Sequence, residues 1–153
     1  MTTQRMDGFH IIGISVRTTN ENGKSAQDIP ALWANFLAED TLTKIPNKVS
    51  DDLYCMYTDY EHDYTRPYTT ILGCRVSMLE TIPEGMVGKT MESATYMKFV
   101  AQGNLAQGIV LATWVKIWNS DLPRIYTADF EVYGSKTHNP ENAEVEVFIA
   151  VEP

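Results

Sequence analysis

The sequence predicts an α+β fold in which duplicated βαββ units form a curved antiparallel sheet with two main helices packed on it. Three observations lead to this prediction: the element order β, α, β, β occurs twice, each unit closes with a hairpin, and 153 residues make one domain. The halves span about residues 8–80 and 93–153 of a single domain, residues 1–153. A ligand groove is expected between the halves, because clefts between modules are common ligand sites.

The first half begins with a strand and a helix. Residues 9–16 are rich in β-branched side chains and end at a polar segment, which is typical of a buried strand. Apolar residues between positions 29 and 37 then recur with helical spacing, and Pro30 is tolerated because it lies in the first turn. Two strands, over residues 52–60 and 68–78, complete the unit.

The second half repeats this order after a linker over residues 81–93, which contains Pro and Gly breakers. A strand is predicted over residues 95–101, a helix over 104–118, and a hairpin of strands over 124–133 and 145–151. Sequence identity between the halves is low. The interpretation as a repeat therefore depends on element order and hairpin position.

The start of the second helix has the spacing of a relaxed capping box. Asn104 lies at the N-cap position and Gln107 at the third helical position. Gly108 is then expected inside the helix, at a small cost in stability.

The strand registers are predicted by requiring one apolar sheet face, because a slip of one residue exchanges the two faces. This requirement places Cys55 opposite Cys74 in the first hairpin, and Phe130 opposite Ile149 in the second. Glu131 then lies on the other face, which is expected to line the groove. Its aromatic and apolar walls are predicted to be Tyr54, Met56, Tyr96, Trp114 and Phe148.

Glu131 is the charged group expected in this groove. A carboxylate among aromatic faces suits a lipophilic cation, because ring quadrupoles attract positive charge and the acid neutralises it in a partly desolvated site. The alternative is that Glu131 is a solvated residue on the open face of the sheet.

The composition excludes several classes of partner. Twelve Lys and Arg against 20 Asp and Glu give a net charge of −8, which argues against binding nucleic acid or an anionic membrane surface. No apolar run approaches the ~18 residues of a membrane span, and residues 1–8 lack the pattern of a signal peptide, so a cytoplasmic location is expected. No nucleotide-binding or metal-ligand spacing is present, so we expect no cofactor.

Several segments together resemble the GyrI-like effector-binding domain, the ligand-sensing half of AraC- and MerR-type bacterial regulators. The family also includes stand-alone proteins, some of them carried on integron gene cassettes. The matching segments are residues 29–33 (IPALW), 82–86 (IPEGM), 96–99 (YMKF), 114–118 (WVKIW), 129–133 (DFEVY) and 147–151 (VFIAV). Single fragments are weak signals, but their order and spacing are specific, and the similarity covers nearly the whole chain.

The resemblance implies a groove for small, often cationic or lipophilic compounds, with the family's acidic residue at Glu131. Aromatic positions that line the pocket or fill the core correspond to Trp33, Phe36, Tyr96 and Trp114. For Trp33 and Phe36, core packing is favoured, because both lie on the apolar stripe of the first helix. Nothing before residue 9 has the length of a DNA-binding domain, so direct nucleic-acid binding is not expected.

Three functions follow. The favoured one is a stand-alone small-molecule binding protein for sensing or sequestration. The alternative, implied by hydrolase relatives, acts on strained cyclopropane-bearing compounds with Glu131 as acid or base, assisted by Tyr133 or Tyr96. The third is a module that relays ligand occupancy to a separate transcription regulator.

Overall fold

The computed structural model describes residues 3–153, and its elements follow the predicted order with two further strands. The strands are β1 (Thr3–Met6), β2 (Phe9–Thr18), β3 (Leu53–Thr58), β4 (Tyr68–Val76), β5 (Val87–Met91), β6 (Ala94–Gly103), β7 (Ala128–Tyr133) and β8 (Ala143–Val151). The α-helices are α1 (Ser25–Ala38), α2 (Thr41–Lys44) and α3 (Ile109–Trp118). Short 3₁₀ turns are η1 (Glu21–Gly23), η2 (Leu105–Gln107), η3 (Ser135–Thr137) and η4 (Pro140–Asn142).

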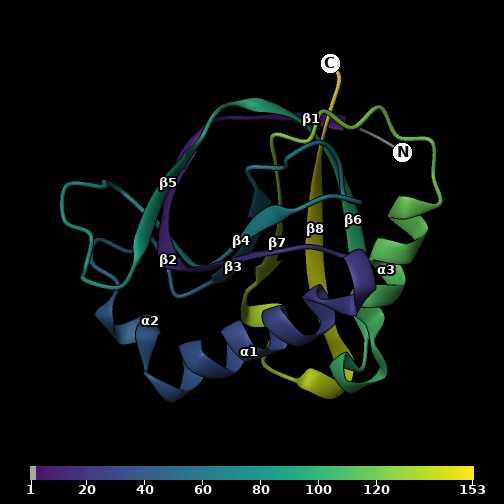
Figure 1. Ribbon diagram of the computed structural model, residues 1–153. Helices are drawn as coiled ribbons and strands as arrows, with labels where there is room; N and C mark the ends of the chain where they lie inside the picture. The colour runs from purple at the N-terminus through teal and green to yellow at the C-terminus, as the bar shows by residue number, and fades with distance from the viewer. Residues whose placement is uncertain (1–2) are drawn as a thin grey trace.

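All strands belong to one curved antiparallel sheet in the order β1-β6-β8-β7-β3-β4-β2-β5 (Figure 1). The predicted α+β class, with α1 and α3 packed on a curved sheet, is confirmed. Strands β3 and β7 are neighbours at the centre of the sheet, so the two predicted halves meet there. The duplication itself stays a prediction.

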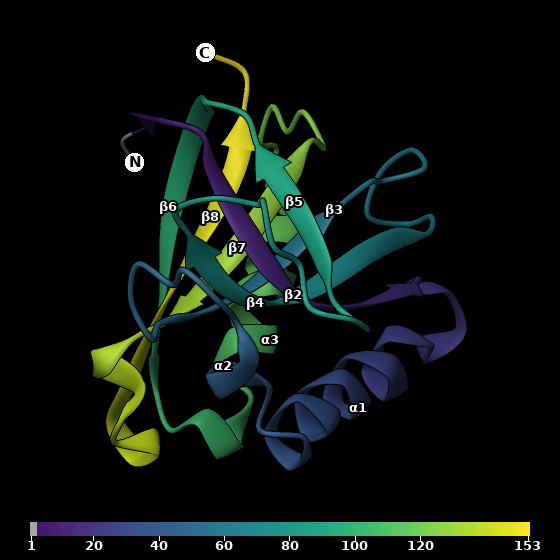
Figure 2. The ribbon, with the colours of Figure 1, turned by 90° about the vertical axis from the view of Figure 1, so that its left-hand side faces the viewer.

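The linker predicted over residues 81–93 was wrong in part, because it contains β5, and β1 was also missed. Strand β1 is short and mostly exposed, and its sequence TQRM has no apolar alternation that would indicate a strand. In the structure, β5 pairs with β2 and β1 pairs with β6 (Figure 2).

These two pairings continue one register across a bend. Thr3 faces Met97 in one ladder, and Phe9 faces Met91 in the other. At the bend, a Cβ added to Gly8 would lie 2.6 Å from the carbonyl oxygen of Met91, so only glycine allows this approach. The paired strands therefore curve over one face of the sheet.

The second long helix begins later than predicted. Gly108 has φ of 71°, a left-handed conformation that favours glycine and separates η2 from α3. The side chain of Asn104 accepts a hydrogen bond from the backbone of Ala106 at 2.9 Å, so it caps the 3₁₀ turn and not the α-helix. The predicted unbroken helix over residues 104–118 was wrong, because a glycine there ends one turn and begins the next.

The predicted registers were also wrong, with unequal consequences. Cys55 faces Leu72 and not Cys74, a shift of two residues that leaves each side chain on its predicted face. Phe130 faces Phe148, a shift of one residue that exchanges the two faces of the second hairpin. Glu131 therefore lies on the face that carries the helices. The requirement of one apolar sheet face did not identify the correct register, because both faces of this hairpin are buried.

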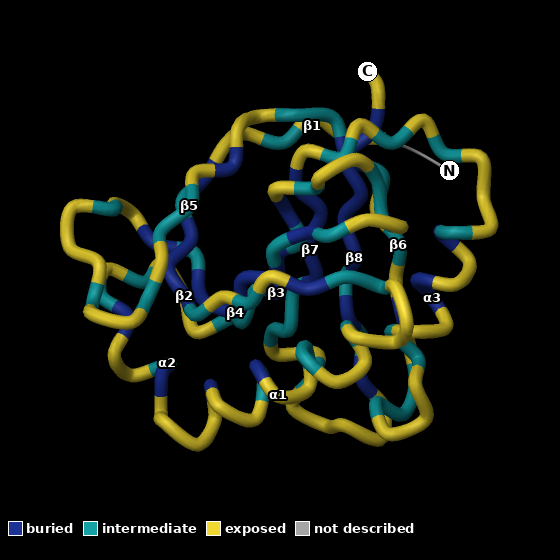
Figure 3. Tube along the Cα trace, in the orientation of Figure 1, coloured by how far each residue is buried: buried dark blue, intermediate teal, exposed yellow. Residues whose placement is uncertain are grey.

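The core consists of three clusters. One lies on the face under the curved strands and includes Phe9, Met56, Tyr96, Phe130 and Phe148. The other two lie on the opposite face, one beneath α1 and one beneath α3. In Figure 3 the central strands are mostly dark blue, whereas the outer sides of the helices are exposed. No helix within residues 3–153 is long and apolar enough to span a membrane.

Candidate binding pocket

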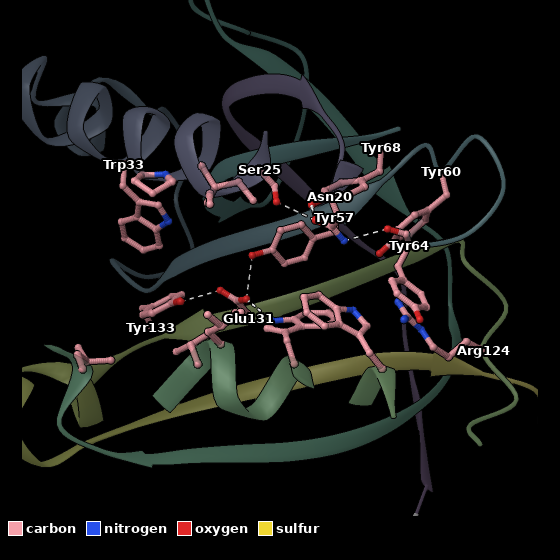
Figure 4. Close-up of a pocket in the computed structure, with 18 residues that line it drawn as sticks. Asn20, Ser25, Trp33, Tyr57, Tyr60, Tyr64, Tyr68, Arg124, Glu131 and Tyr133 are labelled. Atoms are coloured by element: carbon pink, nitrogen blue, oxygen red, sulfur yellow. Dashed lines mark hydrogen bonds between the residues drawn. The ribbon is translucent and has the colours of Figure 1, made fainter. Parts of the chain in front are cut away.

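A pocket of about 750 Å³ lies between α1 and α3, over the central strands β3 and β7 (Figure 4). Its polar lining includes Glu131 and Arg124. Its aromatic lining consists of Trp33, Tyr57, Tyr60, Tyr64, Tyr68, Trp114, Trp118 and Tyr133. The remaining walls are formed by Asn20, Ser25, Ala26, Ile29, Pro30, Leu105, Val110 and Leu111. Residues of both predicted halves therefore form one site.

Glu131 lies on β7, one of the central strands of the sheet, and 2% of its surface is exposed. Oε2 accepts hydrogen bonds from the Tyr57 hydroxyl at 2.8 Å and from Nε1 of Trp114 at 2.6 Å. Oε1 accepts one from the Tyr133 hydroxyl at 2.6 Å. The carboxylate is thus held by three donors, and Figure 4 shows Tyr57 and Tyr133 pointing toward it from different sides.

Three elements position these donors. Tyr133 follows Glu131 by two residues on β7, so strand alternation places both side chains on one face. Tyr57 comes from the neighbouring strand β3, and Trp114 comes from α3 with its ring 5.3 Å from that of Tyr57. From α1, Trp33 packs edge-on against Tyr133, with ring centroids 4.8 Å apart.

Burial dominates the electrostatics of Glu131. Desolvation raises the pKa of this carboxyl above its ordinary value, while the hydrogen bonds from Tyr133, Trp114 and Tyr57 oppose the rise. Burial also raises the pKa of both tyrosines well above 10, so they remain protonated donors. Among residues 3–153, no basic side chain forms an ion pair with Glu131.

The other polar group of the pocket is Arg124, and its partner is Asp129. Nη2 of Arg124 lies 2.8 Å from Oδ2 of Asp129, with 5% and 0% of the side chains exposed. The same oxygen accepts a hydrogen bond from Tyr60 at 2.6 Å, and Oδ1 accepts one from the backbone of Ala150 at 2.8 Å. Within the described chain, no group of three or more His, Cys, Asp or Glu side chains is arranged to hold a metal ion.

Of the predicted site residues, the structure brings together Glu131, Trp114 and Trp33. Trp33 was expected in the core, yet it lines the pocket, whereas Phe36 is buried with 1% exposed. Four others lie on the opposite face and do not line this pocket: Tyr54, Met56, Tyr96 and Phe148. The cause is the register error, which assigned the pocket to the wrong face of the sheet.

The sequence interpretation missed most of the tyrosines. Tyr57 follows Cys55 by two residues and so falls on the predicted apolar face. Tyr64 lies between the strands predicted over residues 52–60 and 68–78, but its ring stacks on Trp118 with centroids 5.6 Å apart. Arg124 was also missed. Alternation along β7 could have indicated that Tyr133 accompanies Glu131 in the pocket, because Asp129, Glu131 and Tyr133 share one face.

Comparisons with known proteins give a family match and one related sequence. Residues 4–151 match the family Cass2, described as integron-associated effector binding protein. The chain is 27% identical over 150 residues to YobU of Bacillus subtilis (strain 168), a candidate transcriptional regulator, covering 95% of this chain and 94% of YobU.

Two solved structures share the fold. The integron cassette protein VCH_CASS2 of Vibrio cholerae is 30% identical, with a TM-score of 0.75 and coverage of 99% of this chain and 95% of that one. SAV2435, solved bound to tetraphenylphosphonium, is 17% identical, with a TM-score of 0.76 and coverage of 99% and 93%.

Proposed function

The chain belongs to the integron-associated effector binding protein family and binds small molecules, and on this premise we propose that its ligands are lipophilic organic cations. Glu131 is the proposed counter-ion. The observation that carries the proposal is a buried carboxylate with three hydrogen-bond donors and, among residues 3–153, no basic partner.

A buried charge is costly unless it is paired, and an organic cation in the pocket would provide the missing partner. The three donors support the ionised form of Glu131, because an ionised carboxylate only accepts hydrogen bonds. The aromatic walls add attraction through their ring quadrupoles. A volume of about 750 Å³ also falls within the ~300–1,000 Å³ typical of sites for drug-sized ligands.

Tetraphenylphosphonium is a suitable probe, because the structure of SAV2435 with this cation shares the fold. Tetraphenylborate has nearly the same size and shape with the opposite charge, so the pair isolates the effect of sign. Calorimetry would measure both affinities for the unchanged protein, for Glu131→Gln and for Glu146→Gln. The last variant is the matched control, because Glu146 pairs with Lys98 at 2.6 Å and lies on the opposite face of the sheet.

The unchanged protein and Glu146→Gln are expected to bind the cation and to reject the borate. Glu131→Gln should lose about 2–5 kcal/mol of affinity for the cation, which is roughly a 30-fold or larger rise in Kd. Equal affinity of the unchanged protein for both ions, or an undiminished affinity in Glu131→Gln, would refute the counter-ion role.

In the hydrolase alternative, Glu131 would act as acid or base with Tyr133, whose hydroxyl donates to it at 2.6 Å. Tyr96 cannot assist, because it is buried on the other face and donates to the backbone of Ala128 at 2.8 Å. The second buried acid, Asp129, is already engaged by Arg124 and two other donors. Binding is therefore favoured over catalysis.

Sensing and sequestration would use the same pocket. The description of YobU as a candidate transcriptional regulator supports sensing, in which a separate regulator would respond to ligand occupancy. Direct contact with DNA is not part of the proposal, because a net charge of −8 opposes binding to phosphates.

A further inference from the structure

We propose that Arg124 is a second recognition point of the same pocket, for an uncharged hydrogen-bond acceptor carried by the ligand. The inference rests on the proposed function and narrows it. The ligand class becomes organic cations that bear an ester, ketone or amide oxygen at a distance from the positive charge.

The first observation is a pair of unused donors. Arg124 lines the pocket, and its Nη2 donates to Asp129 at 2.8 Å. Its Nε and Nη1 are buried, and no hydrogen-bond acceptor of residues 3–153 pairs with them. Buried donors are normally paired, so an acceptor that enters here gains an interaction that the chain does not provide.

The surroundings of Arg124 explain why the chain itself does not pair these donors. Both oxygens of Asp129 already accept other hydrogen bonds. The guanidinium is otherwise enclosed by aromatic rings, with its Cζ 4.4 Å from the centroid of Tyr126 and 5.8 Å from those of Tyr64 and Trp114. Ring faces attract the charge of a guanidinium, but they do not replace an acceptor in the plane of its N–H groups.

The charges at this end of the pocket favour a neutral acceptor. Asp129 already balances Arg124, so a carboxylate of the ligand would leave an excess negative charge in a buried place. An ester or ketone oxygen accepts the same hydrogen bonds without a charge.

Trp114 connects the two recognition points. Its Nε1 donates to Glu131 at 2.6 Å, and its ring lies 5.8 Å from the Cζ of Arg124. A ligand that packs across this one indole therefore reaches Glu131 with its cationic part and Arg124 with its acceptor.

Tyr64 covers this second point. It belongs to the loop between β3 and β4, and its ring stacks on Trp118 at an interplanar angle of 12°. The stacked pair lines both the main pocket and a smaller cavity of about 260 Å³. Because Nε and Nη1 of Arg124 are enclosed, the proposed contact requires a side chain of this cluster, such as the Tyr64 ring, to move aside.

The test compares triphenylphosphonium cations that carry a chain ending in an ethyl ester with cations that carry a plain alkyl chain of equal length, at three chain lengths. Calorimetry gives the ratio of the two affinities, which cancels effects on the cationic part. The unchanged protein should prefer the ester by about 5–10-fold at one or more lengths, the gain typical of one hydrogen bond.

The variants remove the donors in steps. Arg124→Lys retains a charge for Asp129 but lacks Nε and the planar fork, so the preference should shrink. Arg124→Met with Asp129→Asn removes all the donors of Arg124 without leaving a buried unpaired charge, and the ratio should approach 1. Arg75→Lys is the matched control and should retain the ratio, because Arg75 packs on the Phe9 ring of the other face.

The outcomes separate the two proposals. If the alkyl cation binds in a Glu131-dependent manner but the ester is not preferred at any length, the Arg124 inference fails and the proposed function stands. An ester preference that persists in the double variant also overturns the inference. If neither cation binds, or binding ignores Glu131→Gln, both proposals fail.

Discussion

At the scale of single residues, Glu131 is the position where the stability of the fold and the proposed binding of ligand make opposite demands. Burial raises the pKa of the carboxyl, although the three donors oppose the rise, so ionisation of Glu131 is less favourable in the empty pocket than in the unfolded chain. A bound cation favours the ionised form instead. Conflicts of this kind are common at functional sites, where stability is lost in exchange for binding.

This conflict predicts a pH dependence of cation binding. Below the raised pKa of Glu131, the acid is neutral and no longer attracts the cation, so Kd for tetraphenylphosphonium should increase as pH falls. The increase approaches about tenfold per pH unit at the acidic end. Calorimetry between pH 4 and 8, with circular dichroism to verify folding, measures this profile.

Glu131→Gln is the control for that profile, since Gln does not titrate and its Kd should be independent of pH. As pH falls, the Kd of the unchanged protein should begin to increase while the pH is still above 4.5, the ordinary pKa of the carboxyl. A profile that is shared by both proteins would mean that another group controls binding.

At the scale of elements, α1 presents one side to the core and another to the pocket. Phe36 is 1% exposed and packs beneath the helix, whereas Trp33 is half-buried and lines the pocket. The two residues are three positions apart on one apolar stripe, so periodicity does not distinguish them.

The two positions should respond differently to substitution. Trp33→Ala is expected to weaken tetraphenylphosphonium binding about tenfold with little change in the free energy of unfolding, because it removes a pocket wall. Phe36→Leu should cost about 1 kcal/mol of unfolding free energy and leave Kd unchanged, because it alters only the core. Urea denaturation and calorimetry measure the two quantities. A larger stability loss for Trp33→Ala than for Phe36→Leu would contradict this division.

The same element scale shows what the sequence could and could not predict. The element order was predictable, because residues 9–16 are rich in β-branched side chains and the apolar residues between positions 29 and 37 have helical spacing. Glu131 was identified from the strand pattern and from the family resemblance, but its face was not predicted correctly, because Phe130 and Glu131 are both buried and either register satisfies an apolar face. Tyr64 and Arg124 lie outside the periodic elements, and only the folded chain shows that they line the pocket.

At the scale of the whole molecule, the pocket lies where the two predicted halves meet. Its walls come from α1 on one side and α3 on the other, and its floor comes from the neighbouring strands β3 and β7. A ligand bound there contacts both halves, so its binding free energy should stabilise the whole fold. The net charge of −8 adds only a weak attraction for cations, because salt screens it beyond about 8 Å.

This location predicts a single thermal transition that moves as a unit when ligand binds. At a tetraphenylphosphonium concentration of 100 Kd, the fold should gain about 2.7 kcal/mol and Tm should rise by roughly 5–10 °C. At pH 7 and without ligand, Glu131→Gln should have a higher Tm than the unchanged protein. Adding the cation should shift the Tm of this variant only a little. The reason is that the raised folded-state pKa makes ionised Glu131 destabilising above that pKa, whereas the difference disappears below pH 4.5, where the acid is protonated in both states. Scanning calorimetry measures both effects. Two transitions of which only one moves would show that the halves unfold separately and that the ligand contacts one of them.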